Sequence, residues 1–137
     1  MQPQFSIEHV GLAAPDPTAL KDWYARIFGA RVIYSSGATP PAFIIEMPGG
    51  AWLEIYQGHY AANETSDNRL HGWRHLALRV DSIEGAKREL EQKGVEFTEQ
   101  VKPAGGGGSV LFFQDPEGNL LHLLERPADW LTTKREA

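Results

Sequence analysis

The stretch that decides the fold occurs twice, as His9-Val10-Gly11-Leu12-Ala13 and as His75-Leu76-Ala77-Leu78-Arg79-Val80. In both copies aliphatic side chains alternate with small or polar ones, which is the period of a half-buried strand. An aspartate follows each copy, and then apolar residues recur at helical spacing over residues 18–28 and 82–93. Each helical stretch ends at a glycine, a common helix terminator. The chain therefore repeats one structural unit.

Three short strand-like runs follow each helical stretch, and a turn sequence precedes the last run of each half. The runs are residues 31–34, 42–47 and 51–56 in the first half, and residues 95–99, 109–114 and 120–125 in the second. We predict an α+β fold in which two βαβββ modules, residues 5–57 and 73–126, form a curved mixed sheet. A polar linker joins the modules, and residues 1–137 form a single domain.

Composition narrows the chemistry. The chain has no cysteine, so any metal must be bound by nitrogen and oxygen ligands. A net charge of −5 argues against a nucleic-acid partner, because phosphate binding needs a basic surface. No run approaches the roughly 20 apolar residues of a membrane span, and no signal peptide is evident. We expect a cytoplasmic protein that acts on a small molecule.

The alternation of side chains predicts which residues share a face of the sheet. His9, Glu54 and His75 each lie opposite an aliphatic set that should pack under the helices. The last strand is apolar on both faces and does not discriminate; Glu125 shares its face with Leu121 and Leu123. We predict that the curved sheet gathers His9, Glu54, His75 and Glu125 in a cup. The remaining histidines are interpreted as non-ligands: His59 and His71 lie in the linker, and His122 is expected to point away from the cup.

Two imidazoles and two carboxylates suit one divalent metal ion, such as nickel, cobalt, zinc, iron or manganese. Taken singly, a strand histidine is more often a surface or hydrogen-bonded group, and a glutamate is usually solvated. Taken together, two carboxylates among Trp52, Leu121 and Leu123 are costly to bury without a cation. The combination favours the metal-site hypothesis.

These residues resemble the vicinal oxygen chelate superfamily, which includes glyoxalase I, bleomycin-resistance proteins, methylmalonyl-CoA epimerase and extradiol dioxygenases. The resemblance covers about residues 5–126. It rests on Ile7-Glu8-His9-Val10-Gly11-Leu12, on Trp73-Arg74-His75-Leu76-Ala77-Leu78, and on the Asp115-Pro116-Glu117-Gly118 turn before the last strand. In metal-binding members the ligands lie on the first, fourth, fifth and eighth strands, which correspond here to His9, Glu54, His75 and Glu125. That set resembles glyoxalase I most closely.

The resemblance also implies a mechanism and a pocket. A glyoxalase I-like lyase or isomerase moves a proton through a metal-stabilised enediolate, with Glu125 as the first candidate for the base and Glu54 as the second. The implied homodimer and the small vicinal-oxygen substrate follow from the same comparison. The predicted substrate pocket is lined by Trp52, Tyr56, Phe113 and Leu123, and Arg79 is a candidate either for an anionic substrate group or for a surface salt bridge.

Two departures keep alternatives open. Glyoxalase I of bacteria has a glutathione-contacting arginine four positions after its first ligand and an asparagine four positions after its second, and Ala13 and Gly58 stand there in this chain. Glutathione dependence is therefore not carried over. Extradiol dioxygenases carry a tyrosine near the metal, before the last ligand strand, and the region about Asp115 has none. An Fe(II) dioxygenase and a drug-binding resistance protein remain the alternative functions.

Overall fold

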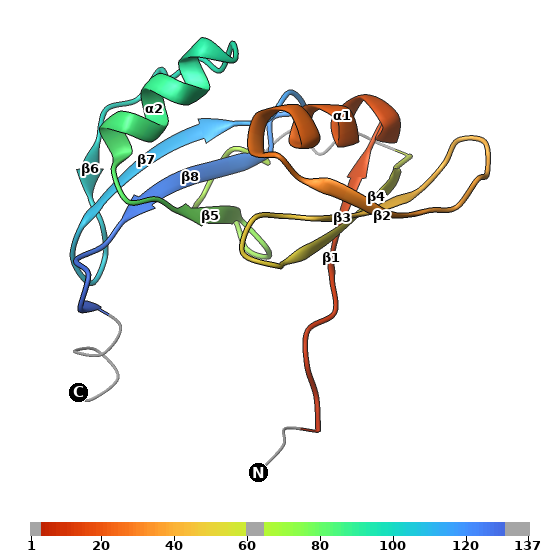
Figure 1. Ribbon diagram of the computed structural model, residues 1–137, viewed down its shortest axis with the longest axis horizontal. Coiled ribbons are helices and arrows are strands. Elements are labelled where there is room, and N and C mark those ends of the chain that lie inside the picture. The colour runs from red at the N-terminus through yellow and green to blue at the C-terminus, as the bar shows by residue number, and fades with distance from the viewer. Residues whose placement is uncertain (1–3, 60–64, 131–137) are drawn as a thin grey trace. The chain divides into compact units, whose positions relative to one another are not determined.

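The computed structural model describes residues 4–59 and 65–130 (Figure 1). The chain divides into two compact units, residues 1–63 and 64–137. Each unit contains a four-stranded mixed sheet and one helix, in the order strand, helix, strand, strand, strand. The predicted α+β fold with two βαβββ modules is confirmed.

The first unit orders its strands β1-β4-β3-β2. β1 pairs in parallel with β4, and the β4–β3 and β3–β2 pairs are antiparallel. The elements are β1 (Val10–Ala14), α1 (Pro17–Phe28), β2 (Arg31–Ser35), β3 (Phe43–Glu46) and β4 (Trp52–Gln57).

The second unit repeats this arrangement as β5-β8-β7-β6, again with one parallel pair, β5–β8. The elements are β5 (His75–Arg79), α2 (Ile83–Gln92), β6 (Lys102–Pro103), β7 (Ser109–Gln114) and β8 (Leu120–Glu125). β7 pairs with β8 over its whole length, and β6 pairs with β7 through two residues only. The first strand of each module therefore lies beside the last strand of the same module.

Side-chain caps fix both helix starts. The Asp16 carboxylate accepts a hydrogen bond from the Ala19 amide at 3.1 Å, and the Ser82 hydroxyl accepts one from the Gly85 amide at 3.1 Å. Both residues satisfy amides that have no partner inside the helix. Gly29 ends α1 in the left-handed conformation at φ 73°. Neither helix of the described segments is long and apolar enough to cross a membrane.

Each helix covers one face of its own sheet (Figure 1). In the first unit α1 contacts β1, β3 and β4, and the buried side chains of the sheet include Ile45, Leu53 and Ile55. In the second unit α2 contacts β7 and β8. The buried side chains there include Leu111, Phe113, Leu121 and Leu123, which alternate with residues of the opposite face. The other face of each sheet is free of its helix and carries the candidate site.

One predicted strand is absent. Residues 95–99 form no strand, and the short β6 that pairs with β7 begins only at Lys102. The apolar residues that suggested alternation have other contacts: Val95 donates its amide to the Leu90 carbonyl at the end of α2, and the Phe97 ring packs 5.2 Å from that of Phe113. Their alternation reflects packing against the helix end and the core, and not a place in the sheet.

Candidate metal centre

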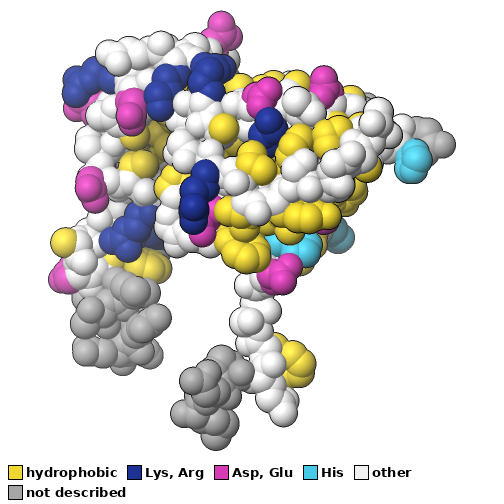
Figure 2. Space-filling view, turned by 45° about the vertical axis from the view of Figure 1, so that its right-hand side comes forward, with side chains coloured by type: hydrophobic (Ala, Val, Ile, Leu, Met, Phe, Trp, Pro, Cys, Tyr) yellow, Lys and Arg dark blue, Asp and Glu magenta, His cyan; other side chains and the backbone are white. Residues whose placement is uncertain are grey.

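The first unit brings His9 and Glu54 together. Glu54 lies on β4 opposite Gly11 of β1, and His9 lies two residues before Gly11 on the same side of the chain. His9 Nε2 is 3.8 Å from Glu54 Oε1, and each side chain is about one-third exposed. Two ligand atoms that each lie about 2.1 Å from one ion are at most about 4.2 Å apart, so this separation fits a shared metal. In the space-filling view histidine and acidic side chains reach the surface next to one another (Figure 2).

Two aromatic residues flank this pair on β4. Trp52 and Tyr56 share the face of Glu54, as predicted, and Tyr56 lies across Gly11, where an added Cβ would be 3.3 Å from the ring. Trp52 donates its indole N–H to Glu46 at 3.4 Å. The Arg31 guanidinium, which donates to the same carboxylate at 3.0 Å, is the main reason that the pKa of Glu46 is lowered, and Trp52 adds to the effect. Glu46 is thus engaged in a structural ion pair.

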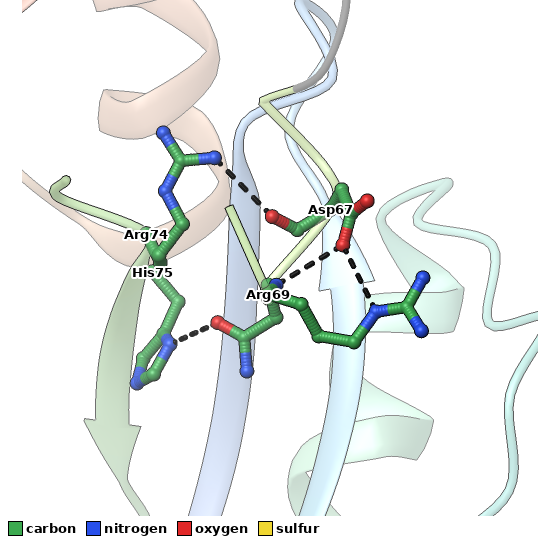
Figure 3. A network of polar contacts seen from close by, with 5 residues as sticks. Asp67, Arg69, Arg74 and His75 are labelled. Atoms are coloured by element: carbon green, nitrogen blue, oxygen red, sulfur yellow. Dashed lines mark hydrogen bonds and ion pairs between the residues drawn. The ribbon is translucent and has the colours of Figure 1, made fainter. Parts of the chain in front are cut away.

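In the second unit the linker orients His75. His75 Nδ1 lies 2.6 Å from Asn68 Oδ1, so the second ring nitrogen, Nε2, takes no part in this contact. Figure 3 shows the turn that carries this contact: the Asp67 carboxylate accepts from the Arg69 amide at 3.0 Å, and Arg74 donates to the Asp67 carbonyl at 3.2 Å. The Arg69 amide also lowers the pKa of Asp67. The polar linker therefore has a defined role beside the site.

His122 is the partner of His75. The two rings have centroids 4.7 Å apart, and the Phe112 ring lies 4.8 Å from that of His122. Burial of His122 lowers its pKa, and the nearby charges of His75 and Arg126 lower it further, against a hydrogen bond to the Leu123 carbonyl. The imidazole is therefore neutral at physiological pH, which is the form that binds metals.

The predicted direction of His122 is wrong. In the parallel β5–β8 pair, Ala77 lies opposite His122, so His75 and His122 share one face of the sheet. Glu125 shares the other face with Leu121 and Leu123, as the alternation predicted, but that face packs under α2. The sequence does not determine which face of β8 packs against α2, because both faces of this strand are apolar.

Glu125 contacts the first turn of α2 and does not lie on the face of His75. Its Oε1 atom accepts a hydrogen bond from the Ile83 amide at 2.8 Å, in the first turn of α2. A carboxylate at a helix start satisfies an unpaired amide and complements the helix dipole. Phe113 and Leu123, predicted to line the substrate pocket, are also on this side and are only 4% and 2% exposed. They belong to the core.

The internal repeat contains the signal that identifies His122. Glu54 is the third residue of β4 and pairs with the residue two places after His9; His122 is the third residue of β8 and pairs with the residue two places after His75. Gln57 and Glu125 are the sixth residues of the same strands, and both contact the start of a helix, since Gln57 donates to the Pro15 carbonyl at 3.4 Å. In the internal repeat, therefore, His122 occupies the position that corresponds to Glu54.

A cavity of about 360 Å³ opens on the His75 face of the second sheet. His75 and His122 line it, together with Val110 and Phe112 of β7, Leu124 of β8, Lys102 and Pro103 of β6, Ala104 and Gly105 of the loop before β7, and Arg126. Lys102 and Arg126 were not singled out from the sequence, because the position of Lys102 depends on the β6–β7 pairing and that of Arg126 on contacts with the Gly105 and Gly107 carbonyls. Arg79 is exposed and shares the His75 face, and it has no ion pair within 4.0 Å in the described part of the chain.

The candidate ligands thus come as pairs. Within residues 4–59 and 65–130 no three histidine, aspartate or glutamate side chains gather closely enough to hold a metal ion. The first unit offers an imidazole and a carboxylate, and the second offers two imidazoles.

Comparison with known proteins agrees with the fold. The family model described as the Glyoxalase/Bleomycin resistance protein/Dioxygenase superfamily matches residues 6–123. The uncharacterized protein YwkD of Bacillus subtilis is 29% identical over 126 residues, which cover 88% of this chain and 97% of that protein. The uncharacterized protein YaeR of Escherichia coli is 27% identical over 124 residues, covering 88% and 95%.

Solved structures share the fold. A glyoxalase family protein from Enterococcus faecalis has a TM-score of 0.74 and 28% identity, covering 88% of this chain and 97% of that one. A mutant of the fosfomycin resistance protein FosX from Listeria monocytogenes, in complex with Mn(II) and 1S,2S-dihydroxypropylphosphonic acid, has a TM-score of 0.68 and 21% identity. The match covers 95% of this chain and 97% of the FosX chain. At that identity the similarity to FosX extends to the fold alone.

Proposed function

Because the chain belongs to the Glyoxalase/Bleomycin resistance protein/Dioxygenase superfamily, we propose that it is a metal-dependent lyase or isomerase resembling glyoxalase I. Its substrate is a small molecule with oxygen atoms on adjacent carbons, and the reaction moves a proton between those carbons. The proposed ligands of one divalent metal ion are His9, Glu54, His75 and His122, with His122 in the place first predicted for Glu125.

The observation that carries the proposal is the orientation of the three histidines. In each ring Nδ1 faces an oxygen acceptor: Glu8 Oε1 at 2.9 Å from His9, Asn68 Oδ1 at 2.6 Å from His75, and the Leu123 carbonyl at 3.4 Å from His122. Metal-bound histidines usually donate their second nitrogen to such a partner, which fixes the tautomer and leaves the other nitrogen as the ligand. The donor set fits nickel, cobalt, zinc, iron or manganese.

Glu54 becomes the proposed base. A bound metal would polarise the substrate oxygens and so acidify the neighbouring C–H group. Glu54 is the one carboxylate among the four proposed ligands, whereas the first candidate, Glu125, is engaged by the Ile83 amide. The partial exposure of Glu54 leaves it accessible to a substrate, and Trp52 and Tyr56 beside it would contact the substrate body.

A second candidate function is an Fe(II)-dependent oxygenase. The observation that favours it is that the proposed set contains two imidazoles and one carboxylate, the ligand combination typical of non-haem Fe(II) oxygenases. In this case oxygen uptake with catechols would require Fe(II) and would be lost in His9→Ala.

Metal content and activity test the proposal together. We expect elemental analysis of protein purified without an affinity tag to find about one divalent metal per chain, as one four-ligand site requires. Reconstituted protein should then convert hemithioacetals, and Glu54→Gln should lower kcat by about 100-fold or more, the contribution typical of a general base. The matched control is Glu84→Gln, since Glu84 lies on the surface of α2 in an ion pair with Arg88.

Two results would contradict the proposal. Protein that takes up none of nickel, cobalt, zinc, iron or manganese is not a metalloenzyme, and tight drug binding without metal would then support a resistance protein. Oxygen consumption with catechols, without hemithioacetal turnover, would support the oxygenase. We also propose a homodimer, and a monomer mass by sedimentation at micromolar concentration would contradict that assignment.

A further inference from the structure

The cavity of the second unit has two chemically different regions. His75, His122 and Phe112 form one, in which the Phe112 ring lies 6.2 Å from that of His75 and 4.8 Å from that of His122. Arg126 lies four residues beyond His122, a distance of about 13 Å along an extended chain. Both regions line the same cavity, so a bound molecule would meet imidazoles at one end and a guanidinium at the other.

Arg126 is held in place by neutral groups. Its Nη1 atom donates to the Gly105 carbonyl at 2.6 Å and to the Gly107 carbonyl, and its guanidinium lies 4.2 Å from the centroid of the Trp130 ring. No carboxylate lies within 4.0 Å of it in the segments that the structure describes. A guanidinium has five N–H donors, so Arg126 retains both its positive charge and donors for a further acceptor.

The glycine run before β7 makes this arrangement possible. The Trp130 indole donates to the Gly106 carbonyl at 2.6 Å, so three successive carbonyls of the loop accept from Arg126 and Trp130. A Cβ on Gly106 would be 3.2 Å from the Trp130 ring, and one on Gly108 would be 2.0 Å from the Glu125 carbonyl oxygen. Side chains at these positions would displace the loop from the residues that it holds. The guanidinium is therefore pre-organised, which reduces the entropy lost when a ligand binds.

Lys102 adds a second cation on the cavity wall. Its ammonium group lies 5.7 Å from the centroid of the Phe112 ring and 2.7 Å from Glu99 Oε1. Glu99 partly cancels this charge, so Lys102 is the weaker of the two contacts. Between the cations and the imidazoles the cavity is lined by Phe112, Val110 and Leu124, which offer an apolar surface.

We propose that this cavity selects small organic acids, with the carboxylate at Arg126 and Lys102 and the apolar body on Phe112 and Leu124. The opposite end of the molecule then reaches His75 and His122. The inference rests on the proposed function, because it takes the two histidines as the end at which chemistry occurs. A volume of about 360 Å³ is at the low end of the roughly 300–1,000 Å³ range of small-molecule sites. Cationic ligands are disfavoured by the uncancelled charge of Arg126.

A matched pair of probes isolates the charge. Phenylpropionate and phenylpropionamide have nearly the same shape and differ in the charge of the terminal group. We expect calorimetry on the full chain to give an acid affinity at least about ten-fold above that of the amide, because hydrogen bonds to charged groups are the stronger kind. Arg126→Gln should abolish the preference by weakening acid binding, and Lys102→Gln should reduce it less. Arg88→Gln, on the surface of α2 and outside the cavity, should leave it unchanged.

Arg126→Lys separates charge from loop structure. It keeps the positive charge, so it should retain most of the acid preference, and thermal unfolding of each variant shows whether the fold survives. Equal affinity of acid and amide for the natural protein, no acid binding in the millimolar range, or a loss in Arg126→Lys as large as in Arg126→Gln would each overturn the proposal. The titrations are run with and without a chelator. An acid preference in protein that binds no metal would refute the proposed function alone, and metal-dependent activity without an acid preference would refute this inference alone.

Discussion

The two modules have the same topology and place a histidine at equivalent positions near the start of their first strand. The charged groups near that histidine are negative in the first module and positive in the second. His9 lies between the carboxylates of Glu8 and Glu54, at 2.9 and 3.8 Å. His75 lies beside a second imidazole, and the charged groups that line its cavity are Lys102 and Arg126. In the proposed centre the first module therefore supplies the carboxylate ligand, and the second supplies two imidazoles and the cations proposed to bind an acid. Under this proposal the two copies of one structural unit have different chemical roles.

The modules also differ in the side-chain hydrogen bond between the sixth residue of the last strand and the start of the helix. In the first, Gln57 donates to the Pro15 carbonyl at 3.4 Å from an exposed position. In the second, Glu125 accepts from the Ile83 amide at 2.8 Å and is partly buried. At equivalent positions, Gln57 thus makes a weak surface contact in the first module and Glu125 caps the start of α2 in the second.

The largest expected effect separates His122 from Glu125. His122→Ala should lower the affinity for the divalent metal by more than about 100-fold, because loss of outer partners alone costs about 10–100-fold. Glu125→Gln should change it by less than about ten-fold, since its contact lies in α2 and outside the ligand set. Competition with a chromophoric chelator measures both. The reverse order of the two effects would restore Glu125 as the ligand and remove His122.

The second effect compares the orienting partners of the modules. Glu8→Ala and Asn68→Ala each remove the acceptor at Nδ1 of one histidine, and each should weaken metal binding by about 10–100-fold. The control is Asp22→Asn, because Asp22 pairs with Lys21 on the surface of α1. If only one of the two variants has an effect, the metal is bound by the module that carries that variant, and the four-ligand set is wrong.

The third effect concerns stability. Glu125→Ala should lower the free energy of unfolding by about 1–2 kcal/mol, the usual cost of leaving a partly buried amide without its charged acceptor. Gln57→Ala, the matched change in the first module, should cost less than about 0.5 kcal/mol, as exposed substitutions usually do. Urea denaturation of chelator-treated protein measures both. Equal values for the two variants would show that the Glu125 contact does not stabilise α2.

How much the sequence predicts depends on whether a signal is local. Period-2 alternation and caps such as Asp16 and Gly29 are local, and they predicted the element order of both modules correctly. The orientation of β8 has no local signal. Leucines occupy both faces of this strand, Leu121 and Leu123 on one and Leu124 on the other, so only the pairing with β5 decides where His122 points. The run at 95–99 alternates because of core packing, and the prediction of a strand there is wrong. The signal for His122 is a polar residue within an apolar strand, because a buried group of this kind is costly without a partner or a function.

The smallest expected effect is a pH dependence that belongs to the second module. Burial lowers the pKa of His122 in the folded chain, whereas the unfolded chain titrates near 6.5. The unfolded state therefore binds more protons as the pH falls below about 6.5, and stability decreases with acidification until the pH has passed through the lower folded pKa of His122. In chelator-treated protein, the free energy of unfolding between about pH 7.5 and 5 should fall less in His122→Gln than in the natural chain. His71→Gln, in the exposed linker, is the control. Identical pH profiles for the natural chain and His122→Gln would mean that His122 takes up a proton equally well in the folded and unfolded states, and that burial in the second module does not lower its pKa.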